Sequence, residues 1–145
     1  MTATPADVRK ACENYIKAWK TNDKALLLSI LADDAVFCDP VGTPDFVGLE
    51  GVGRFWDFAH TGPADRTLTP VLQEIRACAN EGILRFVMQV RIPSANQGLD
   101  LSIIEYVTVN DQGKIKSLRA FWDETSVAKP DGMDLFVPNV SEAYE

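Results

Sequence analysis

The spacing of hydrophobic positions divides the chain into a helical first part and a strand-rich second part. Near the N-terminus, hydrophobic residues recur at Val8, Cys12, Tyr15, Ile16 and Trp19. This spacing places side chains on one face of a helix. Thr4-Pro5 is typical of a helix start, with a capping hydroxyl followed by a proline in the first turn. The pattern therefore predicts a first helix that carries Tyr15 within its apolar stripe.

Two shorter helices and a short strand are predicted next. Asn22-Asp23 ends the first helix and caps a second one over roughly residues 24–31. Residues 48–60 again show helical spacing and predict a third helix, despite two internal glycines. Between these helices, residues 35–39 predict a strand that ends in the turn sequence Asp39-Pro40-Val41-Gly42, and 46–47 a brief second strand.

The rest of the chain is rich in Val, Ile, Leu, Thr and aromatic residues. It predicts four longer strands, over residues 67–77, 83–92, 99–109 and 114–122. Asn110-Asp111-Gln112-Gly113 is a tight turn signal between the last two strands. The expected fold is α+β, with three N-terminal helices packed in a curved, mainly antiparallel sheet. Beyond Asp123 the periodicity is lost, so we expect one domain over 1–125 and a loosely held acidic tail over 126–145.

Glu105 interrupts an otherwise apolar strand face. Alternate residues of a strand share one face, and here the others are Leu99, Leu101, Ile103, Val107 and Val109. An ionised, unpaired carboxylate on that face costs several kcal/mol. Glu105 must therefore find a partner such as Arg85 or Arg119, take up a proton, or face a cavity. A neutral carboxyl can donate a hydrogen bond.

Composition and charge narrow the function. The chain has 145 residues and a net charge of -7, with no cluster of Lys and Arg, which disfavours nucleic acid and anionic membrane surfaces as partners. No signal pattern or bilayer-length apolar run is present. Three cysteines without a C-x-x-C pair favour reduced thiols in a cytoplasmic compartment. The single histidine, His60, excludes a two-histidine metal site.

Tyr15, Asp39 and Glu105 are the candidate chemical groups, and each also has a structural interpretation. Tyr15 could be a core tyrosine with a backbone partner, Asp39 a turn-forming residue, and Glu105 part of a buried ion pair. Asp33-Asp34 is interpreted as a solvated pair. The glycines of residues 48–53 lack both the preceding long strand and the full spacing of a phosphate-binding loop.

Several short motifs resemble the ketosteroid isomerases, which share the nuclear-transport-factor-2-like (NTF2-like), or SnoaL-like, cone fold. The resemblance extends from about Pro5 to Trp122. The motifs are Tyr15-Ile16, residues 31–35 leading into 38–42, residues 48–50 leading into Phe55-Trp56, residues 110–115, and Arg119-Ala120-Phe121-Trp122.

The resemblance implies an isomerase that uses no metal or organic cofactor. Asp39 would be the general base, and Tyr15 and protonated Glu105 would donate hydrogen bonds to a dienolate oxygen. Asp39, beside a turn, is expected to be better hydrated than Glu105 and ionised. The implied ligand is a steroid-like ketone, the implied assembly a homodimer, and the expected pocket walls are Phe55, Trp56, Phe86, Met88, Ala120 and Trp122.

The chain departs from that family at two places. The second acid is typically Asp, whereas this chain has Glu105, and Leu31 and Trp56 stand where some members have supporting tyrosines. Other functions of the cone fold remain open: a polyketide cyclase, a hydrolase or dehydratase with Asp39 as base, or a non-catalytic binder. By strand alternation Arg119 lies opposite Ala120 and Trp122, which disfavours an Asp-Arg-Asp epoxide hydrolase site.

Overall fold

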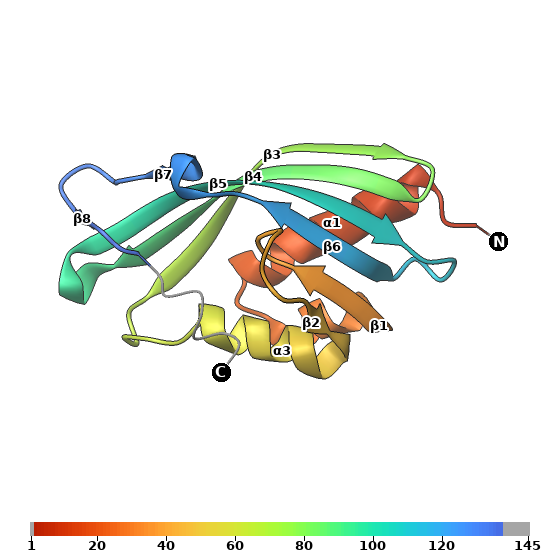
Figure 1. The fold of residues 1–145 in the computed structure, drawn as a ribbon, viewed down its shortest axis with the longest axis horizontal. Coiled ribbons are helices and arrows are strands. Elements are labelled where there is room, and N and C mark those ends of the chain that lie inside the picture. The colour runs from red at the N-terminus through yellow and green to blue at the C-terminus, as the bar shows by residue number, and fades with distance from the viewer. Residues whose placement is uncertain (1, 138–145) are drawn as a thin grey trace.

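The fold consists of helices packed on one face of a curved sheet (Figure 1). The structure is a computed structural model that describes residues 2–137. Within that range the helices are α1 (Pro5–Lys20), α2 (Lys24–Ser29) and α3 (Gly48–Ala59), with 3-10 turns η1 (Pro93–Ala95) and η2 (Glu124–Ser126). The strands are β1 (Leu31–Cys38), β2 (Phe46–Val47), β3 (Thr67–Cys78), β4 (Glu81–Ile92), β5 (Gln97–Val109), β6 (Ile115–Phe121), β7 (Val127–Ala128) and β8 (Asp134–Leu135).

The two predicted helix starts are confirmed by their caps. At α1, the Thr4 side chain accepts a hydrogen bond from the Asp7 backbone N–H, and the Asp7 carboxylate accepts one from the Thr4 N–H. At α2, the Asp23 side chain accepts a hydrogen bond from the Leu26 N–H at 2.9 Å. These local bonds satisfy backbone donors that have no partner within the helix.

The sheet has the order β2-β1-β6-β5-β4-β3, with β7 and β8 added along β5. β1 and β6 are parallel, while the other pairs on the main path are antiparallel. β1 starts at Leu31, earlier than predicted, and α2 ends correspondingly early, because Leu31 pairs with Ile115 across the parallel ladder. A register shift follows, and Asp33 and Asp34 are exposed there, as expected for a solvated pair.

The core lies between the concave face of the sheet and the helices. The predicted stripe of α1 is buried throughout. It faces the inward side of β4 and β5, where every second residue is buried, including Leu84, Phe86 and Ile103. The predicted α+β cone is therefore confirmed, and the apolar sides of helix and sheet meet at its concave face.

The segment after Asp123 is bound to the sheet up to the last described residue. β7 pairs antiparallel with β5, β8 pairs parallel with it, and the Phe136 N–H donates to the Gly98 carbonyl at 2.9 Å. A Cβ at Gly98 would lie 2.9 Å from Pro130 Cγ, so only glycine permits this close approach. The prediction of a loosely held tail is thus wrong for residues 126–137, while residues 138–145 lie outside the described range.

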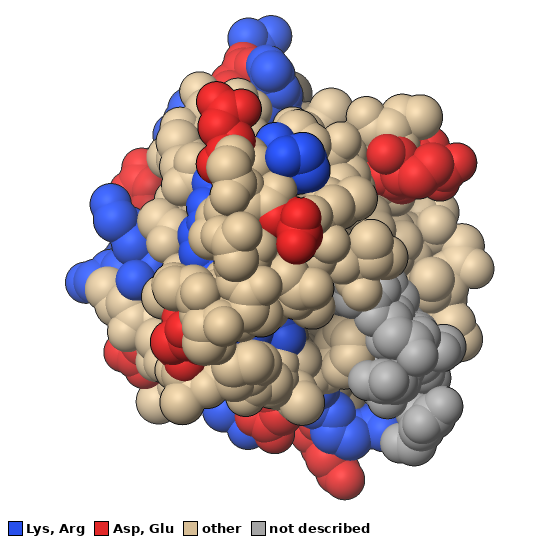
Figure 2. Space-filling view, turned by 90° about the vertical axis from the view of Figure 1, so that its left-hand side faces the viewer, with Lys and Arg blue, Asp and Glu red and all other residues tan. Residues whose placement is uncertain are grey.

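Charged side chains are spread over the surface. On the face shown in Figure 2, basic and acidic residues alternate and no large patch of one sign forms. Among the described residues, no helix combines the length and apolarity that crossing a membrane requires. The feature that distinguishes the molecule is therefore inside the cone.

Candidate active site

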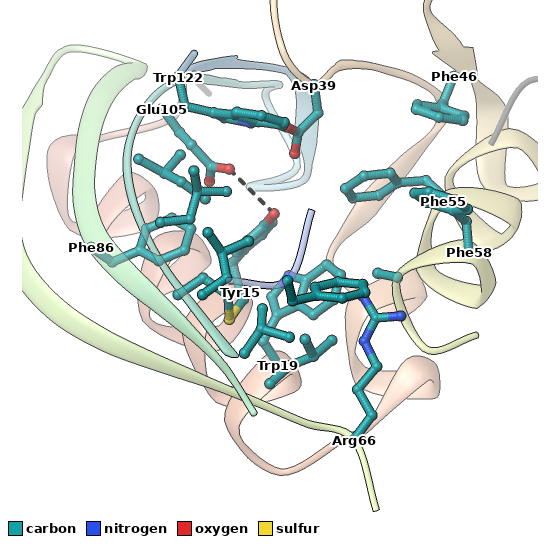
Figure 3. Close-up of a pocket in the computed structure, with 18 residues that line it drawn as sticks. Tyr15, Trp19, Asp39, Phe46, Phe55, Phe58, Arg66, Phe86, Glu105 and Trp122 are labelled. Carbon is teal, nitrogen blue, oxygen red and sulfur yellow. Dashed lines mark hydrogen bonds between the residues drawn. The ribbon is translucent and has the colours of Figure 1, made fainter. Parts of the chain in front are cut away.

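An apolar pocket opens between the concave face of the sheet and the helices α1 and α3. The space between its walls, including the open solvent at its mouth, amounts to about 800 Å³. Four of its lining residues can carry a charge: Tyr15, Asp39, Arg66 and Glu105 (Figure 3). The others are Trp19, Phe46, Phe55, Phe58, Ala59, Leu68, Phe86, Met88, Val90, Leu99, Leu101, Ile103, Trp122 and Phe136.

Tyr15 projects from the buried stripe of α1 into this pocket. Its ring packs beside Trp19 and Phe37, and its hydroxyl donates a hydrogen bond to Glu105 Oε2 at 3.4 Å. Burial raises the pKa of Tyr15 well above its usual value, and the nearby carboxyls of Glu105 and Asp39 add to the effect. The hydroxyl therefore keeps its proton and is available as a hydrogen-bond donor.

Glu105 is on the inward face of β5 and is only 1% exposed. Neither of the ion-pair partners considered from the sequence reaches it, because Arg85 pairs with Glu74 at 3.0 Å and Arg119 is exposed. Burial raises the pKa of Glu105 well above its usual value, and the charge of Asp39 raises it further. Both effects favour the protonated, neutral form of Glu105. Its Oε1 has no hydrogen-bond partner among residues 2–137.

Asp39 follows directly after β1 and is 8% exposed. It is more exposed than Glu105, as expected from its place beside a turn, but it is still buried, because Trp122 lies against it and donates from Nε1 to Asp39 Oδ1 at 2.7 Å. Burial raises the pKa of Asp39 from 3.8 to about 6, and the Trp122 hydrogen bond opposes that rise. Asp39 is therefore still ionised at neutral pH. No described residue donates to its Oδ2.

Strand register brings the two carboxyls to the same pocket. β6 lies between β1 and β5: Cys38 pairs with Arg119 on one side of it, and Ala120 pairs with Glu105 on the other. The Val41 N–H also donates to the Ala120 carbonyl at 2.9 Å, which holds the turn after Asp39 against β6. Residues 66 positions apart in the sequence are thereby separated by one strand.

Four of the six predicted pocket walls line the pocket: Phe55, Phe86, Met88 and Trp122. The prediction is wrong for Trp56, which instead stacks on Trp19 and His60, with ring centroids 4.5 Å and 4.3 Å away. It is also wrong for Ala120, whose methyl group is fully buried within the sheet layer. Both side chains are apolar and buried, and for Trp56 the contacts with Trp19 and His60 hold the ring away from the cavity.

Sequence reasoning missed several lining residues. Phe58 follows Phe55 by three positions on α3, so the helical period could have placed both on one face. Arg66 and Phe136 come from a loop and from an aperiodic segment, and neither carries a local signal. Arg66 enters the pocket just before β3, and Phe136 does so through its backbone bond to Gly98.

The arrangement supplies two complementary groups at one end of an apolar cavity. An ionised carboxylate can accept a proton there, and a neutral acid beside a neutral phenol can donate hydrogen bonds to an oxygen that gains negative charge. Within the described residues, no group of three or more His, Cys, Asp or Glu side chains converges as a metal site. Proton transfer with oxyanion stabilisation is thus a chemistry that the side chains of this pocket can support.

Comparisons with known proteins agree with this fold. A steroid Δ-isomerase from Nocardioides simplex is 28% identical over 117 residues, which cover 81% of this chain and 90% of that protein. Rv0760c from Mycobacterium tuberculosis, solved in complex with estradiol-17β-hemisuccinate, superposes with a TM-score of 0.72 at 22% identity, covering 84% of this chain and 98% of that one.

A second similar structure is that of SalBIII, described as an epoxide hydrolase/cyclase-like enzyme in pyran ring formation of the polyether salinomycin. It superposes with a TM-score of 0.71 at 18% identity, covering 84% of this chain and 95% of that one. At these identities the two structures show a shared fold. The model of the SnoaL-like domain family matches residues 12–118. Because that match spans most of the cone, from the α1 stripe to β6, the chain belongs to the SnoaL-like domain family.

Proposed function

We propose that this protein is an isomerase of the steroid Δ-isomerase type, moving a C=C bond of an apolar ketone from the β,γ to the α,β position. The observation that carries the proposal is the hydrogen bond between the buried Glu105 carboxyl and the Tyr15 hydroxyl in the same pocket as Asp39. The raised pKa of Glu105 favours its neutral form, and a pKa of about 6 leaves Asp39 mostly ionised at neutral pH. A pure binding site for an apolar ligand has no need of a base and two acidic donors, because each buried polar group costs stability.

In the proposed reaction, Asp39 takes the proton from the carbon between the ketone and the alkene. The C–H electron pair forms a new C=C bond to the carbonyl carbon, and the carbonyl oxygen becomes negative. Asp39 then returns the proton to the γ carbon, so the double bond ends in conjugation with the restored ketone. Because Oδ2 accepts no hydrogen bond from a described residue, its lone pair is available for this transfer.

Tyr15 and Glu105 stabilise the dienolate oxygen in this proposal. Their mutual hydrogen bond is long, at 3.4 Å, so it is weak and easily exchanged for bonds to a ligand oxygen. Donors already held in a water-poor pocket stabilise a developing negative charge strongly. Protonated Glu105 can direct its hydroxyl into the cavity without losing another partner at Oε1.

The relatives support a steroid-like ligand and leave the reaction to be tested. The 28% identical protein is a steroid Δ-isomerase, and a structural neighbour binds an estradiol ester. The cyclase-like neighbour shares the fold equally well. The exposed position of Arg119 on the outer face of β6 argues against an Asp-Arg-Asp hydrolase site in this pocket.

The decisive experiment is an ultraviolet assay with a β,γ-unsaturated 3-ketosteroid. We expect the absorption band of the conjugated enone to grow with the wild-type protein and with Arg54→Gln, a variant on α3 outside the pocket, and to stay at the uncatalysed rate in buffer alone. No growth of the band with wild-type protein would contradict the isomerase function for this substrate class.

Trp122→Phe is expected to shift the acidic limb of the pH profile of kcat/KM to higher pH. In the wild type, the hydrogen bond from Trp122 Nε1 lowers the pKa of Asp39. Removing that donor therefore raises the pKa above about 6. We expect kcat/KM at pH 6 to fall about tenfold, the size of one charge-assisted hydrogen bond, and to recover above pH 8. Trp56→Phe is the matched control, since Trp56 does not line the pocket; an unshifted limb in Trp122→Phe would contradict the role.

We also propose that two copies associate through the outer face of the sheet. Ile104 and Phe121 pair across β5 and β6 on that face and are 45% and 47% exposed. We expect wild-type protein to elute as a dimer at micromolar concentration in size-exclusion chromatography, and Ile104→Lys to elute as a monomer. Val47→Lys, at an exposed position on β2, is the control. Elution of the wild type as a monomer would contradict the proposal.

A further inference from the structure

Arg66 is the only cationic residue among the described residues that line the pocket. It lies directly before β3, and Figure 3 shows it at the side of the cavity away from Asp39 and Glu105. Its Nη1 donates to the Thr61 carbonyl, and its Nε is buried without a hydrogen-bond partner among residues 2–137. A guanidinium has five N–H donors, so most of its donor capacity is not used by those contacts.

No carboxylate in the described part of the chain pairs with Arg66. The adjacent Asp65 accepts hydrogen bonds from the Ser94 N–H and hydroxyl, at 2.6 Å and 2.9 Å. The four ion pairs among residues 2–137 involve other side chains. Burial lowers the pKa of Arg66, which shows that its charge is partly desolvated without compensation. A half-buried arginine without a carboxylate partner can form an ion pair with an anion of a ligand.

The ring of Phe136 lies under the guanidinium of Arg66. The Arg66 Cζ atom lies 4.9 Å from the centre of the Phe136 ring, a distance at which a cation and an aromatic ring attract each other. The ring belongs to the segment that pairs with β5. The docking of that segment therefore places Phe136 beside Arg66 at the pocket. A planar group held in this way can present two parallel N–H donors to a carboxylate.

We propose that Arg66 recognises an anionic group on the ligand, so that the preferred substrate is a flat apolar ketone with a carboxylate or similar anion at the end opposite the ketone. The orientation rests on the function proposed above, in which the ketone oxygen meets Tyr15 and Glu105. The charges of the pocket favour the same orientation. Ionised Asp39 repels an anion from one end, while Arg66 attracts it at the other.

A purely structural role for Arg66, as a clamp on Phe136, predicts a different result. Loss of the contact with Phe136 would loosen the mouth of the pocket and weaken the binding of neutral and anionic ligands alike. Loss of a contact with the anion weakens the binding of the anionic ligand only. The two roles are therefore separated by comparing ligands that share one apolar body.

The test is calorimetric titration of the full chain with estradiol and with estradiol-17β-hemisuccinate, which differ by a terminal carboxylate chain. We expect wild-type protein to bind the hemisuccinate at least about tenfold more tightly, with a preference that weakens as salt is added. Arg66→Gln should lose that preference, with its affinity for estradiol nearly unchanged, and Arg66→Lys should keep part of it. Arg54→Gln removes the same charge outside the pocket and should behave as wild type.

Two results would overturn the proposal: equal affinity of wild type for both ligands, or equal weakening of both by Arg66→Gln. Because the titration measures binding alone, it is independent of turnover. A protein that prefers the hemisuccinate but converts no ketosteroid would retain the anion site and contradict the isomerase. A protein that converts neutral ketosteroids but binds both ligands equally would support the isomerase and contradict the anion site.

Discussion

Asp39→Asn is expected to abolish turnover of a β,γ-unsaturated ketosteroid while leaving ligand binding intact. An amide of nearly the same shape can still accept the hydrogen bond from Trp122 Nε1, so the pocket is preserved. It cannot take up and return a proton. We expect kcat to fall at least about a thousandfold, the upper part of the range for a general base, with the dissociation constant of estradiol changed only slightly. The ultraviolet assay and calorimetric titration measure the two effects separately.

The same variant should be more stable than wild type at alkaline pH. The pKa of Asp39 is raised from 3.8 to about 6 on folding, so the folded chain binds this proton more tightly than the unfolded chain. The free energy of unfolding therefore falls as pH rises from about 4 to about 6, and ionised Asp39 costs about 3 kcal/mol above that window. Asp39→Asn removes this cost.

Urea denaturation at pH 8 and at pH 4 checks the sign of this effect. We expect Asp39→Asn to gain as much as about 3 kcal/mol at pH 8, and most of the difference to disappear at pH 4, where wild-type Asp39 is protonated in the folded state. An inactive variant with raised stability cannot owe its inactivity to misfolding. Wild-type turnover in Asp39→Asn, or a loss of stability at pH 8, would contradict the role assigned to this carboxyl.

The inward positions of Tyr15 and Glu105 could be predicted from the sequence because each depends on a local period. A helix repeats every 3.6 residues and a strand every two, so a polar residue in register with apolar neighbours must face the core. Tyr15 fits the first pattern and Glu105 the second, and both side chains are buried in the fold. Arg85 is not beside Glu105, because it alternates to the outer face of β4 and pairs with Glu74 there, while its neighbour Leu84 pairs with Glu105.

Features that depend on long-range packing could not be predicted in this way. Phe55 and Trp56 are neighbours in the same apolar stripe, but Phe55 lines the pocket whereas Trp56 packs between Trp19 and His60. Asp39 looks hydrated in its turn sequence, but the parallel pairing of β1 with β6 brings Trp122 over it. Phe136 has no periodic neighbours and is placed by its bond to Gly98.

Glu105→Leu is expected to lower kcat by about a hundred- to a thousandfold, the usual effect of removing one donor to an oxyanion. Glu105→Gln should be at least about tenfold more active than Glu105→Leu, because its amide N–H can still donate to the ligand oxygen. The reason is the protonation state: the raised pKa of Glu105 favours its neutral form, which a neutral amide imitates and an alkyl group does not. Steady-state kinetics in the ultraviolet assay give the comparison.

The free energy of unfolding of the Glu105 variants separates a chemical role of this residue from a structural one. Glu105 is buried without an ionic partner in the described chain, so replacing it by Leu removes a buried polar group but also leaves the Tyr15 hydroxyl without its acceptor. Because these two effects oppose each other, we expect the free energy of unfolding to change little. Tyr15→Phe is the companion variant. It removes the hydroxyl that is the second proposed donor to the ligand oxygen, while its ring can still pack beside Phe37. If Glu105→Leu turned over substrate as fast as wild type, the oxygen would have to be stabilised elsewhere. If Glu105→Gln were as inactive as Glu105→Leu, hydrogen-bond donation at this position would not explain the need for a neutral acid.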